Sequence, residues 1–179
     1  MNHSHPSFRS TALRLRHNAR RMAGLGLGGV LVAVTALAST GAPAGAAPGQ
    51  HVSDVITFTS HVYLTPPQNG VGHFAIVGDT CQLQPTGQAS IPCSFVGGGT
   101  VGATGGVARG VVTSRNGTIV LDETYVFTGP TTSTGTGPTT KVSGGVTTLG
   151  TFVGNFTTAP TSNPNVLLDW GTFVVSENN

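Results

Sequence analysis

Motifs that carry enzymatic chemistry are scarce in this sequence, and only two cysteines occur in its 179 residues. There is no Gly-x-Ser-x-Gly, His-Glu-x-x-His or Cys-x-x-Cys pattern, which excludes the usual signatures of serine hydrolases, zinc peptidases and dithiol redox proteins. We therefore expect no cofactor. The C-terminal residues Ser176 to Asn179 are polar and offer no anchor for a membrane.

The first 47 residues have the features of an export signal. Residues 1–21 carry five arginines and no acid, residues 22–39 are mildly apolar, and residues 41–47 are small. This pattern predicts a signal peptide over residues 1–47, cleaved after Ala47, and a secreted, extracellular domain over residues 48–179. The pair Arg20-Arg21 leaves both the twin-arginine and the general secretory routes open. An uncleaved anchor is the alternative, although its four glycines weaken a membrane helix.

Removal of the leader reverses the charge balance of the chain. The remaining part has three basic and six acidic residues, a net charge of −3, whereas the full chain has a net charge of +2. The basic excess therefore belongs to export. We expect no nucleic-acid partner, and no membrane partner after cleavage.

The composition after residue 47 is typical of strands and turns. It is rich in Thr, Gly and Val, contains seven phenylalanines, and shows no sustained helical period. Clusters of glycine or proline recur at short intervals, as in all-β proteins. The length of residues 48–179 suits one domain.

Alternating apolar residues predict strands over residues 55–64 and 71–77, joined as a hairpin. Arg115-Asn116-Gly117 predicts a tight turn, and the Thr-, Gly- and Pro-rich residues 129–141 predict a long exposed loop. Further strands are expected over residues 91–101, 107–114, 118–128, 150–158 and 166–175, with two weaker ones in the gaps. Seven to nine antiparallel strands can form an up-and-down barrel of about eight strands or a β-sandwich.

The faces of the first hairpin suggest a register. For the apolar faces of the two strands to coincide, paired residue numbers must sum to an even value such as 134, which places His61 opposite His73. Two histidines across a hairpin can hold a divalent metal if other ligands complete the shell. Both lie on the polar face, so the preferred interpretation is two solvated surface histidines and no metal site.

The two cysteines, Cys81 and Cys93, lie in a chain predicted to be exported. An oxidising compartment favours a disulfide between them. A bridge that closes so short a loop contributes about 3 kcal/mol in the chain-entropy estimate.

Glu123 interrupts an otherwise apolar strand face. In residues 118–128, alternation places it with Ile119, Leu121, Tyr125 and Phe127. Burial of a carboxyl group among apolar side chains raises its pKa, as a general acid requires. The plainer interpretation is a bulge, a position at the barrel rim, or a pairing with an arginine on the neighbouring strand. Glu123 is the only catalytic candidate in the sequence.

The sequence from Gly117 to Gly129, followed by a Gly/Thr-rich hairpin up to Thr158, resembles the allene oxide cyclase and dirigent barrel superfamily and its secreted bacterial members. Where members often have Gly-Gly-Thr-Gly before an aromatic residue, this chain has Gly144-Gly145-Val146-Thr147, and its next aromatic residue is Phe152. The resemblance implies an eight-stranded antiparallel barrel with a small internal cavity. It transfers no catalytic residue.

Three classes of function remain open at this point. A binding module would hold a small hydrophobic ligand inside the barrel. An enzyme of the cyclase or dirigent type would act on a small hydrophobic substrate in the same cavity, with a polar group such as that of Glu123. A structural or interaction protein would use its outer surface. We expect binding or interaction without catalysis, and the oligomeric state is left open.

Overall fold

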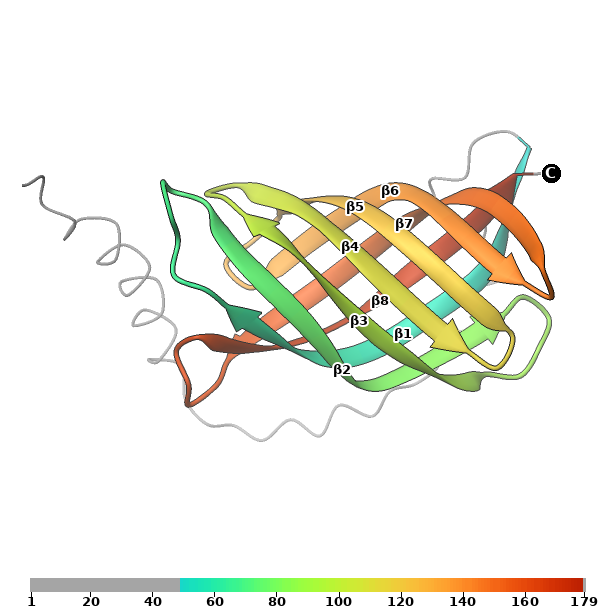
Figure 1. Cartoon of the computed structure of the whole chain (residues 1–179), viewed down its shortest axis with the longest axis horizontal. Helices are drawn as coiled ribbons and strands as arrows, with labels where there is room; N and C mark the ends of the chain where they lie inside the picture. The colour runs from blue at the N-terminus through green and yellow to red at the C-terminus, as the bar shows by residue number, and fades with distance from the viewer. Residues whose placement is uncertain (1–48, 179) are drawn as a thin grey trace, which may run out of the picture. The chain divides into compact units, whose positions relative to one another are not determined.

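The computed structural model describes residues 49–178, which form a closed antiparallel β-barrel of eight strands (Figure 1). The strands are β1 (Gln50–Leu64), β2 (Gly72–Pro85), β3 (Ile91–Val101), β4 (Gly105–Ser114), β5 (Gly117–Phe127), β6 (Thr132–Ser143), β7 (Val146–Pro160) and β8 (Val166–Asn178). Each strand pairs with its neighbours in chain order, and the β1–β8 ladder closes the ring. The barrel prediction is confirmed and the β-sandwich is excluded. The predicted signal peptide and its cleavage point lie outside the described residues.

Residues 49–178 include no helix that could cross a membrane.

A cluster of phenylalanines fills the middle of the barrel. Phe173 lies at its centre, with ring centroids 5.1–5.6 Å from those of Phe58, Phe95, Phe152 and Phe156. Aromatic pairs at these separations add to the stability that burial provides. Other inward-facing residues extend this core toward the end of the barrel where β1 begins and β8 ends: Ile56, Leu83, Ile91, Val112, Ile119, Leu121 and Val175. The barrel is therefore closed by packed side chains across its middle.

The β1–β2 register differs from the one expected. Paired numbers sum to 138 near the hairpin, so His61 lies opposite Val77, and the predicted pairing with His73 is wrong. The predicted even sum was right, because the even-numbered residues of both strands face inward near the hairpin. Asp79 is then an extra residue in β2, a bulge that makes Cys81 and Leu83 the inward residues beyond it.

Residues 129–141 do not form a long loop. Most of this segment belongs to β6, which pairs with β5 and β7. Its glycines permit close approach of the strands: a Cβ at Gly137 would overlap the backbone carbonyl of Asp122. The β5–β6 pairing is interrupted at Asp122 and Glu123, opposite Gly137 and Pro138. Proline lacks the N–H group that a regular ladder needs there.

The hairpin turns follow their local sequence. The turn predicted at residues 115–117 is present, since Ser114 pairs with Gly117, but of Asn116 and Gly117 only Gly117 has a positive φ, at 136°. Gly144 and Gly145 form the β6–β7 turn with φ values of 56° and 81°. Two consecutive positive φ values suit a tight hairpin turn and explain a Gly-Gly pair at this position.

The predicted disulfide is present between Cys81 of β2 and Cys93 of β3, with a Cα–Cα distance of 4.9 Å. It joins the two strands where their ladder shifts register, between the pairs at Val77 and Gln82. The bond thus holds together a weak part of the sheet. A disulfide indicates an oxidising environment.

Candidate functional site

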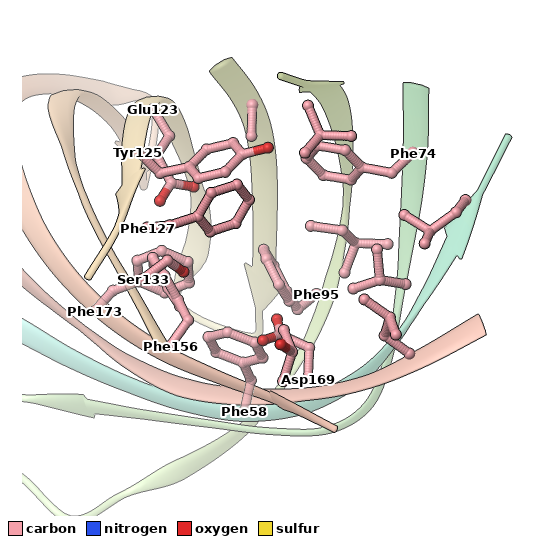
Figure 2. A pocket seen from close by; sticks show the side chains of 17 residues that line it. Phe58, Phe74, Phe95, Glu123, Tyr125, Phe127, Ser133, Phe156, Asp169 and Phe173 are labelled. Carbon is pink, nitrogen blue, oxygen red and sulfur yellow. The ribbon is translucent and has the colours of Figure 1, made fainter. Parts of the chain in front are cut away.

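An open cavity of about 140 Å³ occupies one end of the barrel (Figure 2). It lies above the phenylalanine cluster, at the end where residues 65–71, 102–104, 128–131 and 161–165 connect the strands. Most of its wall is aromatic or aliphatic: Phe58, Val62, Leu64, Phe74, Ile76, Phe95, Val101, Ala108, Tyr125, Phe127, Phe156, Leu167 and Phe173. The polar lining residues are Glu123, Asp169, Ser133 and Thr158.

Glu123 faces this cavity, as its place in the alternation of β5 predicted. Its register partner on β4 is Ala108, whose small side chain leaves room for the carboxyl group. On the β6 side, a Cβ at Gly135 would overlap the Glu123 carboxylate. The carboxyl group therefore lies in a niche that exists because both neighbouring strands carry a small residue.

The arginines expected as partners do not neutralise Glu123. Arg109 lies opposite Asp122, with 3.6 Å between its Nε and the Asp122 Oδ1, on the outer surface. In the described part of the chain no hydrogen-bond donor reaches Oε1 of Glu123. Burial, together with the negative charge of Asp169, raises the pKa of Glu123 to about 7. Glu123 is thus not paired with Arg109, and it lies where the β5–β6 ladder is interrupted, an irregular strand position of the kind that the plainer interpretation expects.

Asp169 of β8 is a second acid in the cavity wall, and its side chain is only 6% exposed. The Ser60 hydroxyl donates a long hydrogen bond of 3.5 Å to its Oδ2, whereas Oδ1 accepts none from any residue between 49 and 178. Burial raises the pKa of Asp169 to about 6, partly opposed by hydrogen bonds from Ser60 and from the Trp170 backbone. Glu123 and Asp169 therefore form an acid pair within one cavity.

Tyr125 lies beside the acid pair but its hydroxyl is engaged. It donates a hydrogen bond of 3.0 Å to the backbone carbonyl of Thr100. Burial and the charge of Glu123 raise the pKa of Tyr125 to about 12, so the phenol stays protonated at neutral pH. Its ring packs edge-on against Phe74 and Phe127 and contributes to the aromatic wall.

The two histidines lie on the outside of the barrel, away from the cavity. The Nδ1 atom of His61 is 2.7 Å from Oδ2 of Asp79, and both side chains are 39% exposed. His73 lies opposite Thr100; its N–H donates to Oγ1 of Thr65, and its carbonyl accepts a hydrogen bond from the Thr65 N–H. Residues 49–178 contain no group of three or more potential ligands that could hold a metal ion.

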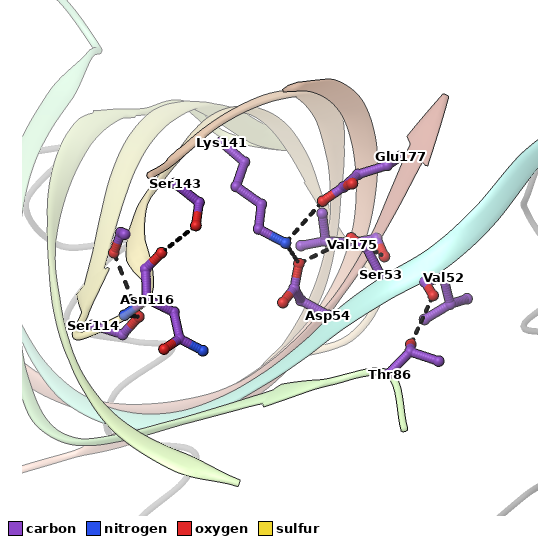
Figure 3. A network of polar contacts seen from close by, with 11 residues as sticks. Val52, Ser53, Asp54, Thr86, Ser114, Asn116, Lys141, Ser143, Val175 and Glu177 are labelled. Atoms are coloured by element: carbon purple, nitrogen blue, oxygen red, sulfur yellow. Dashed lines mark hydrogen bonds and ion pairs between the residues drawn. The ribbon is translucent and has the colours of Figure 1, made fainter. Parts of the chain in front are cut away.

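A polar network occupies the opposite end of the barrel (Figure 3). Lys141 Nζ lies 2.7 Å from Oδ2 of Asp54 and 2.9 Å from Oε1 of Glu177, and Asp54 is only 1% exposed. Burial alone would lower the pKa of Lys141, but its bonds to the two carboxylates more than offset this and raise it. The same interactions overcome the effect of burial on Glu177 and lower its pKa. One cation is thus shared by two carboxylates here, although Oδ1 of Asp54 accepts no hydrogen bond within residues 49–178; the acids of the open cavity have no cation beside them.

Sequence reasoning found Glu123 but missed Asp169. The alternation of β8 contained the signal, because Asp169 lies an even number of residues from Phe173 and Val175, which face the core, and so shares their face of the strand. Leu168 and Trp170 on the opposite parity obscured it, because both faces of this strand then carry large apolar residues.

Comparisons with protein families, with curated proteins and with solved structures find no match for this chain.

Proposed function

We propose that this chain is a secreted binding protein that holds a small hydrophobic ligand in the open cavity of its barrel. The observation that carries the proposal is the cavity itself, whose wall is largely aromatic and aliphatic and which is open at one end. Apolar pockets with a few polar groups are the usual form of small-molecule sites. The disulfide supports the extracellular part of the proposal.

The size of the cavity limits the ligand. At about 140 Å³ it is comparable to the engineered apolar cavities of about 150 Å³ that admit benzene. One aromatic ring or a short branched chain fits inside, and a longer molecule would extend through the mouth past Phe127, which is 46% exposed. The packed phenylalanines beneath prevent deeper entry.

A ligand series tests the proposal. Benzene derivatives and short-chain hydrocarbons should raise the melting temperature with increasing concentration, because binding stabilises the folded state. Ala108→Leu fills the cavity from β4 and should remove this effect. Val107→Leu is the matched control, because Val107 is 53% exposed on the outer face and its variant should bind normally. Absence of binding by the unaltered protein across the series would overturn the proposal.

A second candidate function is catalysis within the same cavity, of the allene oxide cyclase or dirigent type that the sequence resembles. The observation that favours it is Glu123, a partly buried carboxyl group whose Oε1 accepts no hydrogen bond within residues 49–178 and whose pKa of about 7 suits proton transfer at neutral pH. In this function Glu123 would donate a proton to, or accept one from, a hydrophobic substrate held against the aromatic wall.

The second candidate is tested by product chirality. An allene oxide generated in the assay should give a product with enantiomeric excess in the presence of the protein, and Glu123→Gln should abolish the excess while the fold is retained. Asp122→Asn, on the outer face of the same strand, is the control. A racemic product with the unaltered protein, despite ligand binding, would leave only the binding function.

A further inference from the structure

The open cavity contains two acids and no base. Its lining residues include Glu123 and Asp169, but no lysine, arginine or histidine. The remaining titratable group that faces the cavity is the Tyr125 hydroxyl, which donates a hydrogen bond to the Thr100 carbonyl. Nothing in the cavity wall therefore compensates the charge of two carboxylates, in contrast to the Lys141 network at the other end.

Both acids also lack hydrogen-bond donors on one oxygen. Within residues 49–178, Oε1 of Glu123 and Oδ1 of Asp169 are buried and accept no hydrogen bond. A buried acceptor without a donor costs about 1–3 kcal/mol, and more when it is charged. Asp169 is over nine-tenths buried, and its side chain is seen directed into the cavity (Figure 2). Oδ1 of Asp54 at the other end also accepts none, but Asp54 binds Lys141; in the open cavity the free oxygens have no cation beside them, and this is where a ligand would supply donors.

The chemistry of the wall distinguishes among possible donors. A neutral hydroxyl group offers one proton and leaves the two negative charges uncompensated. An ammonium group offers up to three protons and a positive charge. Aromatic faces also attract cations, and Phe58, Phe95, Phe127 and Phe156 line the same cavity as the acids. A carboxylate or phosphate ligand would be repelled.

We propose that the natural ligand is a small primary or secondary amine with an apolar body, bound as its ammonium ion by Glu123 and Asp169. The apolar body occupies the aromatic wall and the nitrogen faces the acid pair. This inference rests on the proposed binding function and specifies the chemical class of its ligand.

Three probes of the same shape test the inference: 2-phenylethylamine, 2-phenylethanol and propylbenzene. They differ only in the group that would meet the acids. At about pH 8, where the unbound acids are largely ionised, calorimetry should give a dissociation constant for the amine at least about tenfold below those of the alcohol and the hydrocarbon. At about pH 5 the acids gain protons, and the amine should lose most of this advantage while the neutral probes bind as before.

Variants assign the effect to the two carboxyl groups. Glu123→Gln and Asp169→Asn should each reduce the preference for the amine several-fold and leave propylbenzene binding within about twofold. Asp122→Asn removes an acid from the outer face of β5 and should change neither. Circular dichroism confirms the fold of each variant, and if one fails to fold, the pH dependence of the unaltered protein decides.

The outcomes separate this inference from the function on which it rests. Equal affinity for the three probes, or an amine preference that survives both substitutions, overturns the amine inference and leaves the binding function standing. If none of the three probes binds, propylbenzene included, the binding function fails as well.

Discussion

The carboxyl groups of Glu123 and Asp169 belong to strands that do not pair, yet both line one cavity and the charge of Asp169 raises the pKa of Glu123. Two acids that disfavour each other's ionisation make the cavity sensitive to pH. This arrangement depends on closure of the barrel, because Glu123 and Asp169 are far apart in the sequence and lie on strands that are not neighbours.

Glu123 should make the barrel less stable as pH rises. The pKa of Glu123 is about 7 in the folded barrel, whereas the ordinary value for glutamate, used here for the unfolded chain, is 4.5. The folded state therefore holds the proton more tightly, and the free energy of unfolding decreases as pH rises from about 4.5 to about 7. Glu123→Gln should therefore gain on the order of 2 kcal/mol at about pH 8 and nearly nothing at about pH 4. Urea unfolding at both values measures this difference, with Asp122→Asn as the control. A gain independent of pH would contradict the assignment.

Gly135 and Glu123 should be energetically coupled. Gly135→Ala introduces a Cβ that overlaps the Glu123 carboxylate, and it should cost about 1–3 kcal/mol of stability. In a Glu123→Ala background the overlap disappears and the cost should fall by at least about 1 kcal/mol. Gly137→Ala meets the backbone carbonyl of Asp122 instead, so Glu123→Ala should not rescue it. A double-mutant cycle by chemical unfolding gives both coupling energies.

Lys141 should contribute strongly to stability. Lys141→Met leaves the buried Asp54 carboxylate without its cation and should cost about 3 kcal/mol, since an unpaired buried charge is unfavourable. Arg109→Met breaks the exposed pair with Asp122 and should change stability by about 0.5 kcal/mol or less. Comparable losses in thermal unfolding would show that the Lys141 pair is as weak as the surface pair.

The disulfide should be formed in the native protein and support the β2–β3 ladder. Intact mass should be two hydrogens below that of the reduced chain, and replacement of both cysteines by serine should cost about 3 kcal/mol or less. The melting temperature should then fall by several degrees, as scanning calorimetry would measure. Labelling of Cys81 and Cys93 by a thiol reagent in untreated protein would count against the bond.

Export should remove the leader. Protein recovered from culture medium is expected to begin at Pro48, after cleavage at Ala47, and N-terminal sequencing or mass spectrometry would detect this. A cell-bound product that still begins at Met1 would favour the uncleaved anchor.

Alternation in the sequence predicted most of the barrel because one face of each strand is buried. The strand from Thr118 to Thr128 gave both the inward face and the position of Glu123 within it. The alternation of apolar residues did not predict β6, because its inward positions at Gly135 and Gly137 carry no side chain. Such a strand has no apolar period, and its strand character comes from pairing with β5 and β7.

Register and cavity required tertiary information. The bulge at Asp79 changes the parity of β2 without any break in strand-like composition, so Phe74 and Cys81 both face inward. The distance in sequence between Glu123 and Asp169 likewise hides their common cavity. Only the closure of the sheet brings them to one end.

The order of the strands around the ring is the order of the strands along the chain. Seven of the eight ladders therefore join sequence neighbours, and the β1–β8 ladder alone joins the two ends of the barrel sequence, with Gln50 bonded to Asn178 at 2.8 Å. A chain in which Gln50 and Asn178 were linked and new ends were opened at the Gly144-Gly145 turn would retain every strand neighbour. The barrel is in this sense a circular arrangement of hairpins, and any one of its ladders could join the two ends of the barrel sequence without a change of strand neighbours.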